Sequence, residues 1–396
     1  MAGSLRPTAL GDTHNFGRSV SRRAGRVAKP RSVFWEWLVL AQESPLRQRL
    51  GQLAERDGLG PDAFGFLPTL KFFRARSGIG GEVEAIELEP LPRATLAGRR
   101  ALAVVVGRSL ALWSWLGVAD LHWENLVLGV DASGRIVFGP LDVELMLADL
   151  SLPTETKLLP DADPEYLELC QHACGVRRTL PILGKPLEVA DLLAMVSAYH
   201  GTLALLDRHA ATIAKTIAAT PGLREAPIRV LLRSTSEYVQ AGAETWPPLL
   251  DGELEQLARG DIPYFFRLYG RRGIHYYADR GLRTLKTLPL RGDVPKLEPL
   301  LELSRGLRSA SRQKLREDGL FTVLGAFDAT DFSGKQQGDG LSVTFGARSL
   351  KVVLPDGNEL GAPRNLSAFV SSVYQLCRCG EVRTVLAPAV TRCTAR

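Results

Sequence analysis

Three polar residues, Asp120, His122 and Asn125, follow directly after a long apolar stretch of the sequence. A carboxylate, an imidazole and an amide so close together can orient an attacking hydroxyl group and bind a metal ion. A surface loop with incidental polar residues is the alternative, but it does not explain why these residues gather where the apolar stretch ends. We therefore expect this segment to carry chemistry.

A predicted β-hairpin brings a second carboxylate to the same place. Apolar runs at 126–128 and 136–138 flank the turn 131–134, which contains Asp, Ser and Gly. The outer ends of an antiparallel hairpin meet. Asn125, which precedes the first strand, and Asp142, which follows the second, should therefore lie side by side. They are the expected ligands of Mg²⁺, which binds one or two side-chain oxygens and leaves its other positions to phosphate and water.

Glu144 extends this set, because it lies just beyond Asp142 and could hold a second metal ion or orient the first. The expected cofactors are ATP and Mg²⁺, and Asp120 and His122 should orient the hydroxyl that attacks the phosphate. The order Asp-x-His-x-x-Asn, a hairpin and a metal-binding Asp resembles that of kinases. The position of the His, two places after the Asp, resembles the arrangement in lipid kinases.

A lysine for the nucleotide phosphates should come from the N-terminal part of the chain. Lys29 ends a predicted strand and precedes a helix predicted over 32–40, as the phosphate-binding lysine of kinases does. A solvated basic turn is the alternative interpretation. The sequence has no G-x-G-x-x-G loop, so the hairpin between Asp12 and Val27 would have to cover the phosphates.

Several motifs occur in an order that resembles a known enzyme family. Residues 11–20 contain Asp12-Thr13-His14, and residues 27–32 contain Lys29-Pro30-Arg31. The later segments are 120–125, 141–144, 229–238 with Arg-x-x-x-Arg-x-Thr, and 260–265 with Asp-Ile-Pro-Tyr-Phe. Over residues 11–265 they resemble the dehydratase domain of type 2 lanthipeptide synthetases (LanM enzymes), which has a lipid-kinase-like catalytic core.

This resemblance implies a dehydratase that works in two steps. ATP phosphorylates Ser or Thr of a ribosomal precursor peptide, and phosphate is then eliminated to leave a dehydroamino acid. The implied phosphorylation set is Lys29, Asp120, His122, Asn125 and Asp142, and the implied elimination set is Asp12, His14, Arg229 and Thr235. β-Elimination needs a base for the Cα proton and cationic or hydroxyl groups on the leaving phosphate.

The spacing of Arg229, Arg233 and Thr235 would let a strand or an irregular segment direct all three side chains at one phosphate. Arginine suits this role because its guanidinium binds phosphate through two parallel hydrogen bonds. An exposed basic face is the alternative interpretation.

The chain also departs from the family. Only ten residues precede Gly11, no adjacent Cys-His pair is present for a zinc cyclase, and Ala28 stands where the family usually has Tyr. A partner protein that supplies the missing N-terminal region, or a separate cyclase, is therefore expected beside the peptide. Two further functions remain open: a kinase that stops at the phosphorylated peptide or small molecule, and a pseudokinase-like scaffold.

The composition excludes several classes of protein. Of the 396 residues, 45% are hydrophobic and 23% are charged, which excludes a mainly disordered or fibrous chain. The net charge of +6 is not arranged as a long basic stripe with interleaved aromatics, so no nucleic-acid partner is expected. No apolar run reaches the roughly 18 residues of a membrane span, and no secretory signal is visible. A cytoplasmic location is expected.

The order of the strands and helices that must position these groups predicts an α/β (α+β) chain with a bilobal, kinase-like fold. We expect a β-rich N-lobe with a nucleotide-binding hairpin over 1–95 and a mainly helical C-lobe with the catalytic loop and metal-binding hairpin over 96–318. A β-containing region of unknown role should follow over 319–396. Within these limits the patterns predict a buried helix at 97–117, β-rich sequence at 64–92, helices at 187–243 and 250–318, and strands at 341–345 and 350–354.

Overall fold

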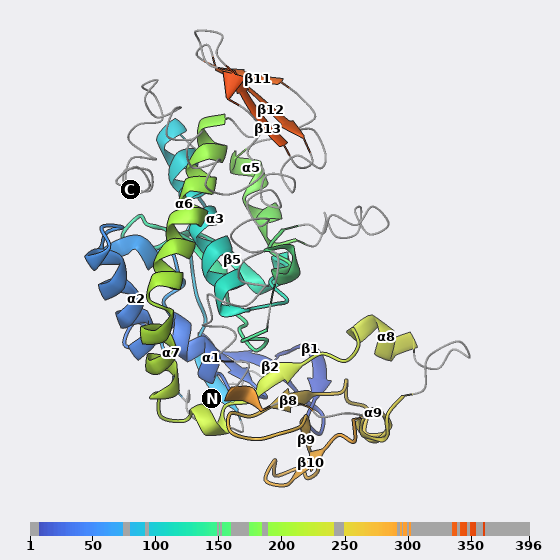
Figure 1. Ribbon diagram of the computed structural model, residues 1–396. Coiled ribbons are helices and arrows are strands. Elements are labelled where there is room, and N and C mark those ends of the chain that lie inside the picture. Colours follow the sequence, from blue (N-terminus) through green and yellow to red (C-terminus); the bar gives the residue numbers. More distant parts are fainter. Residues whose placement is uncertain are drawn as a thin grey trace, which may run out of the picture.

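The computed structural model describes most of the chain up to residue 301 (Figure 1). The described residues are 8–73, 80–91, 95–148, 150, 153–159, 174–183, 189–240, 249–290, 294, 296–298 and 301, together with the backbone of four later strands. Helices and antiparallel strands both contribute, so the chain is α+β, as predicted. No helix within this part of the chain combines the length and the apolar character needed to cross a membrane.

The N-terminal sheet is antiparallel, and its strands follow one another in chain order. They are β1 (Thr8–His14), β2 (Arg18–Arg23), β3 (Arg26–Lys29) and β4 (Gly81–Glu84). Ala24 and Gly25, which join β2 to β3, have φ angles of 46° and 74°. Two successive positive φ values are typical of the tight turn that matches the twist of a hairpin. The hairpin predicted before Val27 is confirmed, and Lys29 ends its last strand.

The helix predicted over 32–40 is confirmed as α1 (Phe34–Leu40), and each of its residues is buried. It is followed by α2 (Pro45–Arg56), whose first turn is capped by the Ser44 side chain. The β-rich prediction for 64–92 is wrong for most of the residues described there. They form loops, apart from Phe64 at the end of a short helix, β4, and isolated bridges that join Phe72 to Val83 and Glu89 to Val130.

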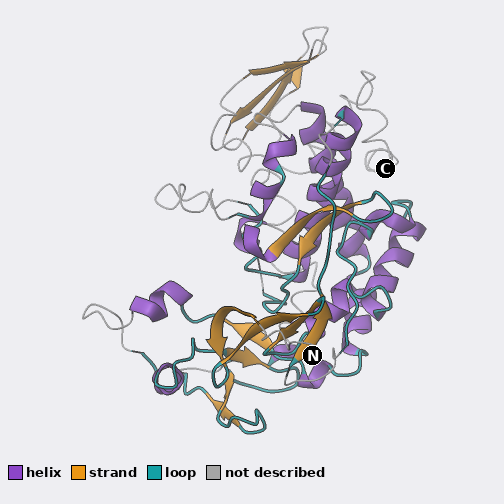
Figure 2. Ribbon diagram, turned by 180° about the vertical axis from the view of Figure 1, so that it is seen from behind, coloured by secondary structure: helices purple, strands orange, loops and turns teal. Residues whose placement is uncertain are grey.

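The long buried helix predicted over 97–117 is confirmed as α3 (Leu96–Leu116). Thr95 caps its start, and Gly117 ends it at a φ of 66°. It packs along α6 (Val189–Arg208), and the two helices lie side by side in Figures 1 and 2. A Cβ atom at Gly107 would lie 2.0 Å from the Met195 carbonyl oxygen, so glycine permits this close approach.

The predicted hairpin is present as β5 (Leu126–Val130) and β6 (Ile136–Pro140), which follow the short helix η2 (Trp123–Asn125). The other helices in the described ranges are short: η1 (Pro61–Phe64), η3 (Pro153–Thr156), η4 (Gly175–Arg178), α5 (Leu180–Leu183), α7 (Ala210–Ala218) and η5 (Leu223–Glu225).

A second antiparallel sheet lies where helices were expected. Its strands are β7 (Ile228–Val230), β8 (Phe265–Arg267), β9 (His275–Tyr277) and β10 (Leu285–Thr287), with α8 (Thr235–Gln240) and α9 (Asp251–Leu257) between the first two. The helical prediction for 250–318 is therefore wrong for the described residues from 258 to 290, and right for α9 and for residues 297, 298 and 301. Tyr264 and Phe266 pack in one apolar cluster and Phe265 in another, so this run alternates between two faces, as a strand does.

The two sheets lie together at one end of the molecule in Figures 1 and 2, beyond the long helices. The N–H of Ile262 donates to the carbonyl oxygen of Thr13 at 2.9 Å and joins them. Asp261 accepts hydrogen bonds from the N–H groups of Phe16 and Gly17, both at 2.7 Å. The turn between β1 and β2 is therefore held by the second sheet.

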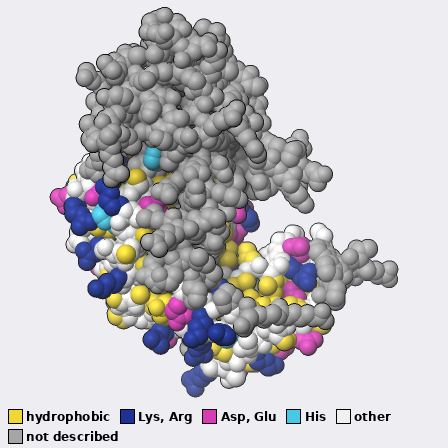
Figure 3. Space-filling model, in the orientation of Figure 1, with side chains coloured by type: hydrophobic (Ala, Val, Ile, Leu, Met, Phe, Trp, Pro, Cys, Tyr) yellow, Lys and Arg dark blue, Asp and Glu magenta, His cyan; other side chains and the backbone are white. Residues whose placement is uncertain are grey.

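The region after residue 319 contains the expected strands. Their backbone forms an antiparallel sheet of β11 (Lys335–Gly338), β12 (Leu341–Gly346), β13 (Ser349–Val353) and β14 (Glu359–Leu360). The strands predicted at 341–345 and 350–354 are thus confirmed. On the described part of the face in Figure 3, basic and acidic side chains are interspersed, as on an ordinary globular surface.

Candidate active site

The hairpin brings Asn125 and Asp142 to the same end, as its sequence predicts. Leu126 at the start of β5 pairs with Pro140 at the end of β6. One residue further out, the N–H of Leu141 donates to the carbonyl oxygen of Asn125 at 2.9 Å. His122 adds to this end, because it lies near enough to the Asp142 carboxyl group to contribute to the lowering of its pKa.

Asp120 lies in a strained loop that an ion pair joins to Lys157. Both residues have a φ of 64°, which non-glycine residues rarely adopt and which is concentrated at functional sites. The Lys157 ammonium donates to Asp120 Oδ1 at 2.7 Å, and the N–H of Leu121 donates to the carbonyl oxygen of Thr156 at 2.8 Å. The Asn125 amide donates to the Asp120 carbonyl oxygen at 2.9 Å. The loop is ordered, and the Asp120 side chain remains 26% exposed.

Lys29 is not part of a solvated basic turn, because its side chain is only 8% exposed. Its ammonium donates to Glu36 Oε1 at 3.0 Å and to the Leu141 carbonyl oxygen at 2.7 Å. Asp142 Oδ2 lies 3.8 Å away. The lysine at the end of β3 therefore reaches the same end of the hairpin as Asn125 and Asp142.

Arg31 lies between three carboxylates. Its Nη2 donates to Glu36 Oε1 at 2.6 Å and also contacts Asp142 Oδ1, and its Nε lies 2.7 Å from Glu144 Oε2. The side chain is 7% exposed. Burial opposes its charge, but Asp142, Glu144 and Glu36 outweigh burial and raise the pKa of Arg31.

Arg229 completes a set that we call the charged cluster. Its Nη1 contacts Glu144 Oε1, and its N–H donates to the Glu144 carbonyl oxygen at 2.9 Å. The side chain is 14% exposed, so an exposed basic face is excluded for it. The charged cluster consists of the cations Lys29, Arg31 and Arg229 and the carboxylates Glu36, Asp142 and Glu144.

The charges of this cluster balance, and they act on Asp142. Burial would raise the pKa of the Asp142 carboxyl group, but Arg31 and Lys29 reverse this effect and lower it. Asp142 therefore carries its charge at neutral pH, although its side chain is only 30% exposed.

His14 lies at the other side of Arg229. Its Nδ1 is 2.7 Å from the Ile262 carbonyl oxygen. A carbonyl can only accept, so Nδ1 carries the proton and Nε2 is left as the basic nitrogen. Burial and the charge of Arg229 lower the pKa of His14, so the imidazole is neutral at neutral pH. Tyr264 stacks near both residues, with its ring 5.8 Å from that of His14.

Thr235 and Asp12 meet across the two sheets. The Thr235 hydroxyl, at the start of α8, donates to Asp12 Oδ2 at 3.2 Å. The charges of Asp12 and Arg229 both act on His14, so all four residues of the predicted elimination set are close neighbours. Arg233 was expected to point at the same phosphate as Arg229 and Thr235. Instead, its Nε donates to Glu253 Oε1 at 2.9 Å.

Magnesium would have few side-chain ligands at this site. Within the described ranges, no three side chains of His, Cys, Asp or Glu are grouped as a metal site. Asn125 and Asp142 still fit an ion that takes one or two side-chain oxygens and phosphate. The buried oxygen Glu36 Oε2 has no hydrogen-bond donor among the described residues, whereas Glu144 Oε2 already faces Arg31 Nε at 2.7 Å. A metal ion at Glu144 would have to displace Arg31 or Arg229.

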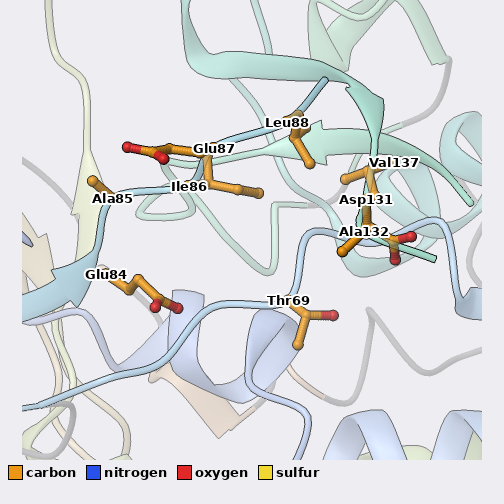
Figure 4. A pocket seen from close by; sticks show the side chains of 9 residues that line it. All are labelled: Thr69, Glu84, Ala85, Ile86, Glu87, Leu88, Asp131, Ala132 and Val137. Atoms are coloured by element: carbon orange, nitrogen blue, oxygen red, sulfur yellow. The ribbon is translucent and has the colours of Figure 1, made fainter. Parts of the chain in front are cut away.

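Two cavities lie near these elements. The first, of about 300 Å³, separates residues 84–88 from the β5–β6 hairpin, and Figure 4 shows Thr69 across from both. Glu84, Glu87 and Asp131 line it, and three carboxylates make it unsuitable for a triphosphate. The second, of about 420 Å³, is lined by Trp123, Leu128, Arg177 and Arg178. Lys29 lines neither of them.

Some residues of the site were not found from the sequence. Glu36 was missed, although a single carboxylate inside the apolar helix α1 is a usable signal. Lys157 was missed because nothing in the sequence links it to Asp120. Arg31 was noted only as part of a motif, and two of its three carboxylate partners, Asp142 and Glu144, are distant in the sequence.

Comparison with known proteins adds no family name. No protein-family model matches the chain, and no curated protein matches its sequence. The resemblance to LanM dehydratases therefore stays a prediction that depends on the motifs quoted above.

Proposed function

We propose that this chain is a LanM-like dehydratase with a bilobal, kinase-like fold, which phosphorylates Ser or Thr of a ribosomal peptide and then eliminates the phosphate. The observation that carries the proposal is the continuity of the charged cluster. Lys29 and Asp142, assigned to phosphorylation, connect through Arg31 and Glu144 to Arg229, assigned to elimination. A kinase without the second step has no need for this connection.

The phosphorylation step begins with Lys29, which binds the phosphates of ATP. Its ion pair with Glu36 is similar to the lysine–glutamate pair that positions the phosphate-binding lysine of protein kinases. Asn125 and Asp142 would hold magnesium, which would supply positive charge to neutralise the phosphates. Asp120 accepts the proton of the peptide hydroxyl, whose oxygen then bonds to the γ-phosphorus while the bond to ADP breaks.

The elimination step uses His14 and Arg229. The basic nitrogen of His14, Nε2, accepts the Cα proton, the electron pair forms the Cα–Cβ double bond, and the Cβ–oxygen bond breaks. The phosphate leaves toward Arg229 and the Thr235 hydroxyl. Arg229 Nε is buried and has no hydrogen-bond partner among the described residues, so it is a donor available to this phosphate.

The test is co-expression with the peptides encoded beside the gene for this chain, followed by mass spectrometry. Dehydration lowers the peptide mass by about 18 per site, and a kinase that stops early raises it by about 80. Unmodified peptides, together with no transfer of phosphate from ATP, would support the scaffold instead. A ring formed in the peptide would require the separate cyclase.

A further inference from the structure

Arg31 is surrounded by negative charge. Three carboxylates converge on its guanidinium from two segments of the chain: Glu36 lies in α1, and Asp142 and Glu144 follow β6. Its Nη1 donates to the carbonyl oxygen of Ser32 at 2.8 Å, which anchors the side chain near its own backbone. A second nitrogen, Nη2, contacts Glu36 and Asp142 at once.

We propose that Arg31 is the internal counter-ion of Asp142. Arg31 pairs with Asp142 until the magnesium-nucleotide complex binds, and Asp142 then binds the metal ion instead. This inference rests on the proposed function. The guanidinium and the metal ion both need the oxygens of Asp142, and two cations cannot share a carboxylate without repulsion. Arg31 is therefore a positioning residue, since it acts through Asp142 and Glu144.

The exchange reaches the elimination residues through Glu144. One oxygen of Glu144 faces Arg31 Nε, and the other contacts Arg229 Nη1. When Asp142 binds the metal ion, Arg31 keeps only Glu36 and Glu144 as carboxylate partners. Arg31 then attracts Glu144 more strongly, so Glu144 binds Arg229 less strongly. Loading of the nucleotide thus frees Arg229 for the phosphate that it must bind later.

Binding of a fluorescent ATP analogue, titrated with Mg²⁺, tests this exchange without any peptide. In Arg31→Gln the competitor is gone, so the Mg²⁺ concentration for half-maximal binding should fall about tenfold, which is the effect of one nearby charge on a divalent ion in a water-like medium. Arg49→Gln, on α2, is the control, because Arg49 is exposed and donates to Gln52 Oε1 at 3.0 Å. Its Mg²⁺ requirement should equal that of the wild type.

A charge-balanced variant keeps the test decisive if Arg31→Gln does not fold. Arg31→Gln with Glu144→Gln removes one charge of each sign from the charged cluster and still frees Asp142. Its Mg²⁺ requirement should again lie below that of the wild type. An unchanged or higher requirement in either folded variant would overturn the inference. A wild-type protein that does not bind the analogue with Mg²⁺ would overturn the proposed function and the inference with it.

Discussion

The two halves of the site differ in how the fold holds them. The phosphorylation half, around Lys29 and Asp142, is part of the charged cluster, in which Lys29, Arg31 and Asp142 each have at least two charged partners. The elimination half depends on fewer contacts, such as the 3.2 Å hydrogen bond between Thr235 and Asp12, which is exposed to solvent. Residues of the first half therefore affect both folding and chemistry, whereas those of the second half can be changed with less effect on stability.

The two halves of the site also differ in how their charges are arranged. In the charged cluster each cation is matched by a carboxylate, so the net field is small until the nucleotide and metal ion enter. Beside the cluster, His14 is neutral, and within it Arg229 Nε has no hydrogen-bond partner in the part of the chain that the structure describes. The phosphorylation half can therefore bind the charged nucleotide and metal ion, whereas the elimination half contains a neutral base that can accept a proton.

The largest expected effect is loss of phosphorylation in Asp142→Asn. The substitution keeps the shape of the side chain and removes the charge that faces Arg31 and Lys29 and would hold the metal ion. Mass spectrometry should find neither phosphorylated nor dehydrated peptide. Asp131→Asn, in the turn of the same hairpin, is the control and should leave both products. If Asp142→Asn still produced phosphorylated peptide, Asp142 would not be needed for phosphorylation and its assignment to that half would be wrong.

Arg229→Lys should separate the two steps. Lysine keeps the charge opposite Glu144 but loses the planar fork that binds phosphate, so elimination should slow by about a hundredfold and phosphopeptide should accumulate. Phosphorylation should change by less than about threefold. Arg224→Lys, exposed in η5, is the control. Equal loss of both steps would contradict the division of the site into two halves.

Glu36→Gln should destabilise the fold, because it leaves Lys29 and Arg31 short of one carboxylate in a buried place. The free energy of unfolding should fall by about 3 kcal/mol, as when one partner of a buried ion pair is removed. Glu82→Gln, in the exposed pair with Arg26, should cost less than about 1 kcal/mol. Urea unfolding measures both, and equal losses would show that burial of the cluster does not matter.

The smallest effect concerns pH. Burial and Arg229 lower the pKa of His14 below the ordinary value of 6.5, so Nε2 is unprotonated at neutral pH. The contribution of His14 to stability should be complete above pH 6.5 and should be lost as the pH falls through the lowered pKa. The elimination rate, measured on isolated phosphopeptide, should be flat above pH 6.5 and fall at lower pH. A rate that already falls between pH 8 and 7 would exclude His14 as the base.

Local patterns in the sequence were sufficient for the hairpin and the buried helix. The apolar runs of β5 and β6 and the turn between them placed Asn125 beside Asp142, because hairpin pairing depends on neighbouring residues alone. The apolar run of α3 predicted its burial for the same reason. Residues 265–287 were assigned wrongly, because their short strands are defined by pairing with each other and with β7.

The sequence by itself determined which chemical groups are available and which of them are neighbours along the chain. Only the tertiary structure decided that Arg31 lies among Glu36, Asp142 and Glu144, and that Asp12 meets Thr235. These residues are separated by up to 223 positions. Their contacts follow from the packing of two sheets and a hairpin, and no local preference encodes such packing.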